Sequence, residues 1–474
     1  MTVNEELDRV SILLHAVQTG PGLKYRKLAQ KLAQLIKDGV YAEGEKLPTH
    51  RALSFDLGVT PGTVSKAYNE LTETGFVIAK VGGGTFVSSI HDTPQAKAFK
   101  VYSDAEGDAI NLSRNIAIPM DIGDIYKSTL RALGTNPETL EELQQYAPEF
   151  GIERHRQAGA RWISFENFQA LPEKIICTNG TQHALFCTLM ATVKRGAVIA
   201  TERFTYPGLI SICRTLGIKM DGLEIDDEGL CPLALEAACQ HKRISALYCT
   251  PTIQNPTTSV MSYERRLAIA QICKKYNVLI IEDETHASLE VNRLPSIGHF
   301  APELGIVLSS MSKAVMTGLR VGYAYAPARL VRRISEMVRI TCWMVTPSAF
   351  QIATHLINEN ITDDLINNQR EEIKRRKSLV EPFLEGHHVK THPYSPHFWI
   401  QMPDSWRASE ICSELEVNGC RVASAESFAV DPIHTGQYIR ASVSVINNDN
   451  DTLINGFQML ADTLNHPTSL PNIN

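Results

Sequence analysis

The sequence predicts a multi-domain protein, with a small N-terminal unit of three helices and a hairpin and a larger α/β domain built on a mainly parallel sheet. The length of 474 residues itself favours more than one domain. Helical periodicity dominates residues 20–88, whereas from residue 110 to about 465 short runs that are apolar on both faces alternate with helical segments. Residues 89–109 are polar and aperiodic, so we expect a linker there.

The composition is that of an ordinary soluble globular protein, with 43% hydrophobic and 21% charged residues. There is no continuous apolar run of the roughly 18 residues that a membrane span needs, and the start MTVNEELDRV lacks the features of a signal peptide. We therefore expect a cytoplasmic protein without a membrane partner. The ten cysteines are scattered without C-x-x-C spacing, so we expect no metal site.

The N-terminal block has the pattern of a winged helix-turn-helix. Residues 24–38 place their apolar residues on one helical stripe, and two further helices are expected to begin at Thr49 and at Thr60. Two β-rich runs around Gly82–Gly84 then predict a hairpin. Residues 21–88 carry nine Lys or Arg against six Asp or Glu, whereas the whole chain has a net charge of −6. This contrast favours a nucleic-acid partner for the block.

In such a fold the third helix enters the major groove of double-stranded DNA. Small polar residues near its start let the helix approach phosphates and base edges, and the glycine turn of the wing adds backbone contacts. The pattern alone leaves a three-helix protein–protein module open. The candidate DNA contacts are Arg51, Thr60, Gly62, Thr63, Ser65, Lys66 and Gly83.

Six strand-like runs are predicted in the larger domain, at residues 174–178, 197–201, 244–250, 278–283, 306–310 and 321–326. The turn after the first run leads into a helix N-terminus, where backbone N–H groups bind phosphate. Taken alone, this is also an ordinary strand–helix turn. Hydroxyls and a guanidinium flank Lys313 farther along the chain. The candidate phosphate contacts are Gly180, Thr181, Gln182, Ser310, Ser312 and Arg320.

Polar residues at the other strand ends suit a flat cationic cofactor. Tyr206 offers a ring for stacking, although alone it reads as a core tyrosine, and Asn255 offers an amide to a phenolic oxygen. Asp283 follows four apolar residues, and a buried carboxylate there requires a cationic partner such as a pyridinium nitrogen. Lys313, desolvated beside a cationic ring, would become a nucleophilic amine.

These motifs, in this order, resemble the fold-type I pyridoxal-phosphate enzymes of the class I/II aminotransferase group over roughly residues 110–465. The resemblance implies a small C-terminal α+β part and pyridoxal 5'-phosphate as the cofactor. It makes Lys313 the Schiff-base lysine, Asp283 the partner of the pyridine nitrogen and Asn255 the contact of the 3' oxygen. It also assigns Arg440, in QYIRASVS, to a substrate carboxylate, and Tyr146, in YAPEFG, to the partner subunit's site.

The sequence departs from that group at several positions. The tyrosine that commonly follows the aspartate by two or three residues is absent, and Thr285 and His286 occupy those positions. His286 either replaces the hydrogen bond of that tyrosine or is a polar neighbour, and we favour the first reading. The loop LSRNIAIP, residues 112–119, lacks the usual glycine. Cofactor binding is therefore better supported than any particular substrate.

The stretch GEKLPTHRALSFDLGVTPGTVSKAYNELTETGFVIAKVGGGTFV resembles the GntR-type winged helix, with Pro61 where that family often has an arginine. A GntR winged helix fused to an aminotransferase-like body resembles the MocR subfamily of transcription regulators. That resemblance implies a domain-swapped homodimer on a paired DNA operator, with pyridoxal phosphate, or its adduct with a small amine or amino acid, as effector. The alternatives are a pyridoxal-phosphate aminotransferase that retains turnover and also binds DNA, and an aminotransferase whose N-terminal block binds protein.

Overall fold

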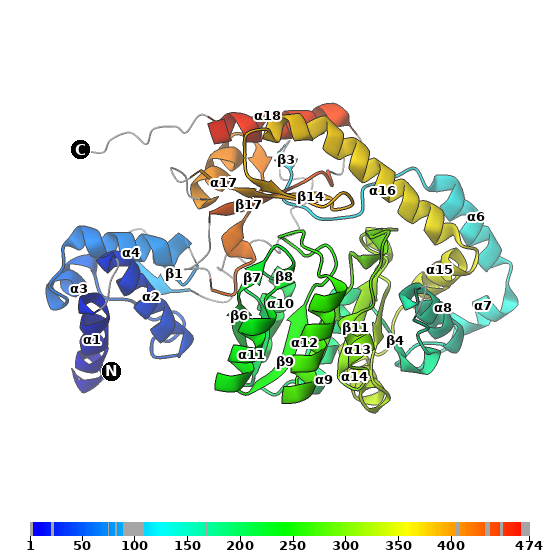
Figure 1. Cartoon of the computed structure of the whole chain (residues 1–474), viewed down its shortest axis with the longest axis horizontal. Coiled ribbons are helices and arrows are strands. Elements are labelled where there is room, and N and C mark those ends of the chain that lie inside the picture. The colour runs from blue at the N-terminus through cyan, green and yellow to red at the C-terminus, as the bar shows by residue number, and fades with distance from the viewer. Residues whose placement is uncertain are drawn as a thin grey trace. The chain divides into compact units, whose positions relative to one another are not determined.

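The computed structural model describes residues 3–19, 23–73, 75–80, 83–88, 109–165, 168–403, 408–431, 437–445 and 449–465. The chain divides into two compact units (Figure 1), one of residues 1–103 with 431–436 and one of residues 104–430 with 437–474. The linker expected at residues 89–109 lies, up to residue 108, outside the described residues.

The smaller unit contains the three expected helices and the expected hairpin. Thr49 caps the second of these helices by accepting a hydrogen bond from the Ala52 amide at 3.2 Å, and Thr60 accepts one from the Thr63 amide at 3.3 Å. A further N-terminal helix was not predicted; its Leu13 joins the core of the unit. The elements are α1 (Val3–Gln18), α2 (Lys24–Lys37), α3 (His50–Asp56), α4 (Pro61–Glu73), β1 (Val77–Lys80) and β2 (Gly84–Val87).

The larger unit is built on a seven-stranded sheet in which six strands are parallel to one another and β12 runs antiparallel to both of its neighbours. All six predicted strands are present, which confirms the mainly parallel sheet. The edge strand β6 was not predicted, because only its last residue is buried. In spatial order the strands are β4 (Ile175–Thr178), β12 (Gly322–Tyr325), β11 (Gly305–Ser310), β10 (Leu279–Asp283), β9 (Ile244–Cys249), β5 (Val198–Glu202) and β6 (Lys219–Leu223).

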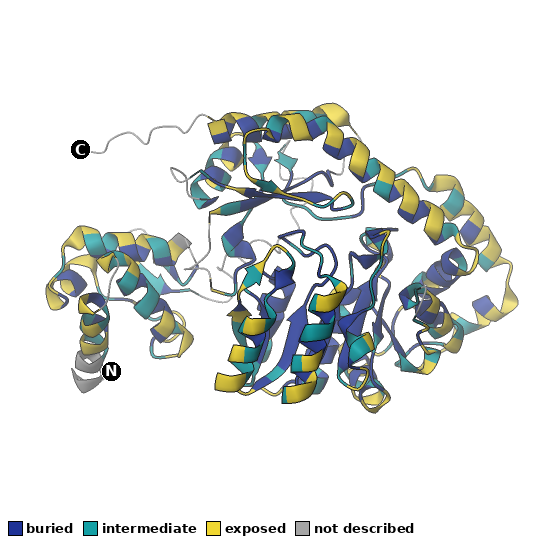
Figure 2. Cartoon of the chain, in the orientation of Figure 1, coloured by how far each residue is buried: buried dark blue, intermediate teal, exposed yellow. Residues whose placement is uncertain are grey.

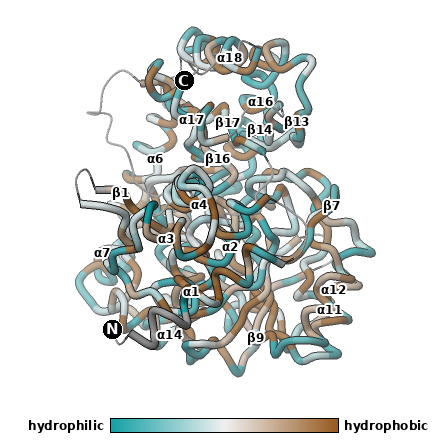
Figure 3. Tube along the Cα trace, turned by 90° about the vertical axis from the view of Figure 1, so that its left-hand side faces the viewer, coloured by the Kyte–Doolittle hydropathy of each residue, from teal (hydrophilic) through white to brown (hydrophobic). Residues whose placement is uncertain are grey.

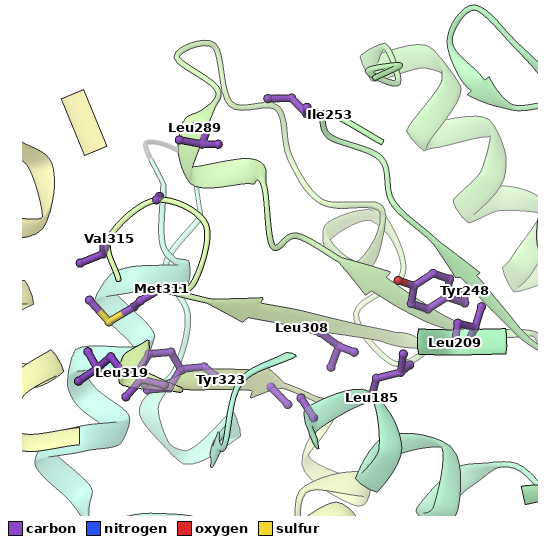
Figure 4. Packing of buried hydrophobic residues seen from close by; sticks show 14 of the residues in the cluster. Leu185, Leu209, Tyr248, Ile253, Leu289, Leu308, Met311, Val315, Leu319 and Tyr323 are labelled. Carbon is purple, nitrogen blue, oxygen red and sulfur yellow. The ribbon is translucent and has the colours of Figure 1, made fainter. Parts of the chain in front are cut away.

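The sheet is buried on both faces, as its apolar strands predict. Ile280 and Ile281 are neighbours in β10, yet they belong to different apolar clusters, because successive side chains point to opposite faces. Figure 2 shows buried strands between helices whose outer faces are exposed, and Figure 3 shows hydrophobic and hydrophilic residues alternating along the helices. In Figure 4, Leu185, Leu308 and Tyr323 lie within the larger cluster.

Of the other helices of this unit, α6 to α8 precede the first strand of the sheet and the rest lie between or after its strands, with a short hairpin, β7 (Ile225–Asp226) and β8 (Gly229–Leu230), among them. Among the described residues, no helix has the length and apolarity that crossing a membrane requires. The helices are α6 (Gly123–Gly134), α7 (Pro137–Glu142), α8 (Glu153–Ile163), α9 (Thr181–Thr192), α10 (Pro207–Leu216), α11 (Pro232–His241), α12 (Tyr263–Tyr276), α13 (Ile297–Phe300), α14 (Ala328–Cys342) and α15 (Pro347–Asn358).

A small α+β part completes this unit, as expected. Its four-stranded antiparallel sheet has the order β13 (Val389–Lys390), β14 (His397–Gln401), β17 (Tyr438–Ser442) and β16 (Ala423–Ser424). Its helices are α16 (Ile361–Val380), α17 (Ala408–Val417) and α18 (Asn450–Asn465). The strand β3 (Ile110–Asn111) pairs with β15 (Cys420–Arg421), and this pairing brings the following residues, up to Asn115, alongside β17 and β14.

Candidate functional site

The predicted site residues follow the carboxyl ends of the parallel strands and so meet at one edge of the sheet. Asp283 ends β10, and Lys313 lies in the turn after β11. Asn255 follows β9, and Tyr206 follows β5 as the residue before α10. Asp283 favours the charged form of Lys313 and raises the pKa of Tyr206, as expected for groups that share one site.

The Asp283 carboxylate is held by hydrogen bonds from two elements. The Tyr248 hydroxyl donates to it at 2.8 Å from the neighbouring strand β9, and the Thr285 amide donates at 3.0 Å. Burial raises the pKa of Asp283, whereas the hydrogen bonds from Thr285 and Tyr248 and the charge of Lys313 lower it. Such a carboxylate is oriented and prepared to accept from a buried cation.

A chain of hydroxyls links this carboxylate to the start of α9. The Thr285 Oγ1 lies 2.5 Å from Asp283 Oδ1 and 2.8 Å from Thr181 Oγ1. Because one hydroxyl has one proton, and the carboxylate can only accept, we assign the Thr285 proton to Asp283 and the Thr181 proton to Thr285. Thr285 therefore supports Asp283 directly.

The turn at Gly180 is shaped for close approach of an anion. Gly180 has φ +79°, in the left-handed region that favours glycine. A Cβ there would lie 2.6 Å from the Arg320 guanidinium, which also donates to Ser312 Oγ at 3.2 Å. The Ser310 hydroxyl accepts from the Ser312 amide at 3.5 Å. The helix N-terminus, two serines and a guanidinium are therefore arranged around one turn, which suits a phosphate group.

Lys313 is an amine in a partly buried, positively charged setting. Burial lowers its pKa to about 8, with Arg440 and Arg320 acting in the same direction and Asp283 opposing them. Its Nζ donates a hydrogen bond to the backbone carbonyl of Asn115. A lysine with this pKa is substantially neutral above pH 8, and the neutral amine is the nucleophilic form.

Arg440 connects β17 to two loops of the site. Its guanidinium donates to Asn255 Oδ1 at 2.6 Å and to the Ser113 carbonyl, and it lies over the Phe428 ring at 4.8 Å from the centroid. Burial lowers the pKa of Arg440 to about 10. Because Asn255 Oδ1 accepts the hydrogen bond from Arg440, the Asn255 amide NH2 is the group that can donate to a ligand.

His286 is buried and neutral. Burial, together with the charges of Lys313 and Arg440, lowers its pKa to about 3. Its Nε2 lies 3.4 Å from the Asn115 amide nitrogen. Two residues occupy the positions where the aminotransferase pattern commonly has a tyrosine. Of these, Thr285 hydrogen-bonds Asp283, whereas His286 contacts Asn115.

The remaining predicted residues differ in exposure. The Tyr206 hydroxyl lies 3.5 Å from the Gln182 carbonyl oxygen, and burial raises the pKa of this phenol. Tyr146, by contrast, is 80% exposed, and its ring lies 5.8 Å from that of Trp343. Tyr146 therefore lies on the surface of this chain.

Several neighbours of the site were missed from the sequence. Tyr248 lies inside an apolar run and gave no polar signal, although its hydroxyl reaches Asp283. Asn115, His397 and Phe428 come from distant parts of the chain and meet the site only through the pairing of β14 and β17 and the loop after β3. Within the described part of the chain, no group of three or more His, Cys, Asp or Glu residues is placed to hold a metal ion.

The residues predicted to contact DNA lie in α3, in and just before α4, and in the hairpin of the smaller unit. Arg51, Gly62 and Lys66 are exposed, and Gly83 lies in the hairpin turn. Within the group, Thr60 Oγ1 lies 3.0 Å from Thr63 Oγ1. Ser65 Oγ lies 3.3 Å from His50 Nδ1, which links α4 to the start of α3.

Comparison with protein families identifies both units. The profile of the aminotransferase class I and II family matches residues 112–455, and that of bacterial regulatory proteins of the gntR family matches residues 24–87. The uncharacterized HTH-type transcriptional regulator YdeF of Bacillus subtilis is 31% identical over 421 residues, covering 88% of this chain and 90% of that protein. The HTH-type pyridoxine biosynthesis transcriptional regulator PdxR of Corynebacterium glutamicum is 26% identical over 371 residues, covering 76% and 78% of the two chains.

Solved structures share the fold of the larger unit. An archaeal alanine:glyoxylate aminotransferase superposes with a TM-score of 0.71 at 21% identity, covering 79% of this chain and 95% of that chain. The kynurenine aminotransferase of Pyrococcus horikoshii gives a TM-score of 0.71 at 19% identity, covering 79% and 97%. At these identities the likeness shows the fold alone.

Proposed function

This chain belongs to the aminotransferase class I and II family and carries an N-terminal domain of the gntR family of bacterial regulatory proteins, and on that basis we propose that it is a DNA-binding transcription regulator that senses pyridoxal 5'-phosphate. The expected relation to MocR-type regulators is confirmed, because the relatives that match three quarters or more of the chain include the HTH-type transcriptional regulators YdeF and PdxR. PdxR is named as a regulator of pyridoxine biosynthesis, which supports pyridoxal phosphate as the ligand of the present chain.

The observation that carries the proposal is that three features meet at the carboxyl end of the sheet. They are Lys313, Asp283 and the turn at Gly180, which lies against the Arg320 side chain. The residues present fit the cofactor: an amine with a lowered pKa, a carboxylate oriented by Tyr248 and a left-handed turn at Gly180 that lies against the Arg320 guanidinium. Bound there, pyridoxal phosphate supplies an aldehyde for covalent attachment to an amine and a ring nitrogen that pairs with a carboxylate.

Each residue of the chain has a separate task in this proposal. Lys313 would hold the cofactor covalently, and the Asp283 carboxylate would accept a hydrogen bond from the protonated ring nitrogen. Arg320, Ser312 and the N-terminus of α9 would hold the phosphate, because they present a guanidinium, a hydroxyl and backbone N–H groups around one turn. The proposed ring contacts are Tyr206 by stacking, Asn255 and His286 at the phenolic oxygen, and the outer phosphate contacts are Gly180, Thr181, Gln182 and Ser310.

We infer further that the effector is pyridoxal phosphate or its adduct with a small amine or amino acid. Arg440 would bind the carboxylate of an amino acid, since its buried Nε has no hydrogen-bond partner in the structure. A ligand changes DNA binding only if it binds one arrangement of the two units better than another. The DNA affinity of the smaller unit would then depend on whether the larger unit has bound its ligand.

A homodimer is the assembly that we propose. The larger unit exposes Tyr146 and Trp343, and exposed leucines lie on the neighbouring helices α6 and α7. Exposed apolar surface of this kind marks a protein interface. In the proposed dimer, Tyr146 would complete the site of the second copy.

The test is a footprint of the purified full-length protein on the DNA upstream of its own gene, at fixed salt, with and without pyridoxal phosphate. A protected paired site that changes with the cofactor supports the sensor. Absence of protection in both states contradicts it. Release of keto acid under saturating amino donor and acceptor would favour the alternative, an aminotransferase with retained turnover.

A further inference from the structure

The loop that carries Asn255 connects β9 to α12, and one buried arginine holds both of its ends. This loop, residues 251–261, is called the Asn255 loop below. Arg266 lies on α12 and is fully buried. Its Nε donates to the Met261 carbonyl at 3.2 Å, and its NH2 group donates to the Pro251 carbonyl at 3.2 Å. A single side chain therefore closes the Asn255 loop.

The same arginine ties this loop to the residue that follows Asp283. Its NH1 group lies 3.6 Å from Glu284 Oε1, and its NH2 group donates to Thr252 Oγ1 at 3.0 Å. The Thr252 hydroxyl donates in turn to the Glu284 carboxylate at 3.3 Å. Because Glu284 directly follows Asp283 in the chain, Arg266 fixes the Asn255 loop against the strand end that carries Asp283.

The backbone of the Asn255 loop is strained on both sides of Asn255. Ile253 has φ +50° and Thr258 has φ +64°, in the left-handed region where β-branched residues are outliers. Such a backbone persists only where the surrounding structure holds it. Besides Arg266, the buried Gln254 amide holds this loop by donating to the Phe204 carbonyl at 2.7 Å. The conformation of the loop is therefore imposed by its contacts with the rest of the unit.

We propose that Arg266 is a positioning residue of the cofactor site, which sets the place of the Asn255 amide relative to the Asp283 carboxylate. The inference rests on the proposed function and deepens it, by adding a residue on which cofactor binding depends although it acts through Asn255. Asn255 and Asp283 are proposed to bind two atoms of one rigid ring. An error of a fraction of an ångström in their separation therefore weakens both contacts.

The hydrogen bonds of Arg266 explain why this position needs a guanidinium. Arginine has five N–H donors in a fixed fork, and here they reach the carbonyls of Pro251, Met261 and Pro295 and the Thr252 hydroxyl. A lysine has three N–H donors on one nitrogen. Arg266→Lys therefore keeps the positive charge near Glu284 but releases part of the Asn255 loop.

The experiment titrates the full-length apoprotein with pyridoxal phosphate and measures the dissociation constant and the pH midpoint of the visible absorption band. Arg266→Lys should weaken binding about tenfold, as expected for the loss of one hydrogen bond. The pH midpoint should shift in the same direction as in Asn255→Ala, because both variants weaken the same contact with the phenolic oxygen.

A double variant distinguishes positioning from a general loss of structure. Arg266→Lys combined with Asn255→Ala should bind about as weakly as Asn255→Ala alone, because the position of an absent amide has no effect. A purely structural role of Arg266 would instead make the two losses multiply, to about a hundredfold.

The matched control is Arg376→Lys. Arg376 is also a buried arginine, which donates to the carbonyls of Val443 and Val445 at 3.0 and 3.2 Å and to Glu372 at 2.7 Å. Both lysine variants should lower the melting temperature of the apoprotein, but Arg376→Lys should keep the wild-type affinity and pH midpoint.

A second variant serves if Arg266→Lys does not fold. Thr252→Val removes the hydroxyl between Arg266 and Glu284 and should weaken binding in the same way. Thr252→Ser retains the hydroxyl and should restore the wild-type affinity.

The outcomes separate this inference from the proposed function. A wild-type protein that takes up no pyridoxal phosphate overturns both. Normal uptake overturns the positioning role alone if Arg266→Lys, or Thr252→Val in its place, binds as the wild type does. The same conclusion follows if Asn255→Ala has the wild-type affinity, if the losses multiply in the double variant, or if Arg376→Lys weakens binding equally. Weaker binding that disappears in the Asn255→Ala background establishes the role.

Discussion

The Tyr248 hydroxyl donates a 2.8 Å hydrogen bond to the Asp283 carboxylate across two neighbouring parallel strands, β9 and β10. Both groups are buried, so the bond is made where an unpaired polar group is most costly. The same carboxylate oxygen pair also accepts from Thr285. These hydrogen bonds from the protein itself fix the orientation of Asp283, which lowers the cost of ordering it when a ligand binds.

Replacement of Tyr248 by Phe should weaken pyridoxal phosphate binding about tenfold, because the carboxylate loses one of the hydrogen bonds that lower its pKa. A spectroscopic titration of the apoprotein measures this. The control is Tyr323→Phe, since Tyr323 is a buried tyrosine whose hydroxyl has no partner. Equal affinities of wild type and Tyr248→Phe would contradict the role assigned to Asp283.

Lys313→Ala should abolish the visible absorption band of covalently held pyridoxal phosphate and leave folding intact. In the wild-type apoprotein, attachment should become faster as pH rises through about 8, the pKa that burial gives Lys313, because only the neutral amine attacks. The matched control is Lys377→Ala: burial also lowers the pKa of Lys377 to about 8, but this lysine bonds Thr391 and His392 instead. A band that survives in Lys313→Ala, or disappears in Lys377→Ala with the protein folded, would refute the assignment.

The contribution of Glu202 to stability should decrease between pH 5 and pH 8, because its carboxyl group is fully buried at the end of β5. Burial raises its pKa from 4.5 to about 7. The folded state therefore holds the proton that the unfolded state loses in this window, so rising pH favours unfolding, by roughly 3 kcal/mol at about 1.4 kcal/mol per pKa unit.

Glu202→Gln cannot titrate, and its loss of stability over that window should be smaller than that of the wild type by about the same amount. Urea unfolding at pH 5 and at pH 8 measures the difference. The exposed Glu385→Gln serves as control and should behave as the wild type. A wild-type difference that Glu202→Gln leaves unchanged would assign the pH dependence to other groups.

Removal of two exposed cations, Arg51 of α3 and Lys66 of α4, in the double variant Arg51→Ala with Lys66→Ala, should weaken binding to DNA of any sequence. If both contact phosphate, the slope of log K against log salt should fall by about two. Titration of labelled operator at several salt concentrations gives both quantities. Lys24→Ala, an exposed lysine of α2, should leave the slope close to that of the wild type, and a double variant with unchanged slope would exclude these phosphate contacts.

Substitution of the exposed aromatic pair, Tyr146→Ser with Trp343→Ser, should shift the proposed homodimer towards monomer, since aromatic side chains dominate the energy of protein interfaces. Sedimentation across a range of protein concentrations measures the equilibrium. Tyr263→Ser is the control, because Tyr263 is 44% exposed but lies on α12, distant in sequence from this surface. A wild-type chain that sediments as a monomer throughout would exclude the homodimer.

The strands of the larger unit were predictable because parallel strands buried on both faces are continuous apolar runs, as in IICT and IIED. The edge strand β6, KMDGL, has no such run, and an edge strand needs none. The caps at Thr49 and Thr60 were predictable because they depend on residues within three positions. Local signals therefore sufficed for most elements of secondary structure.

The sequence by itself determined the two-part organisation, the mainly parallel sheet and the order in which Lys313, Asp283 and Asn255 follow their strands, because each depends on neighbouring residues. Only the tertiary structure decided that Tyr248 supports Asp283 and that Arg440 bonds Asn255. The same holds for Asn115 between two histidines. These contacts join residues that are 35 to 282 positions apart in the sequence. Side-chain hydrogen bonds between such residues depend on how strands pair and loops close. Strand pairing and loop closure produce no periodic pattern that can be recognised in the sequence.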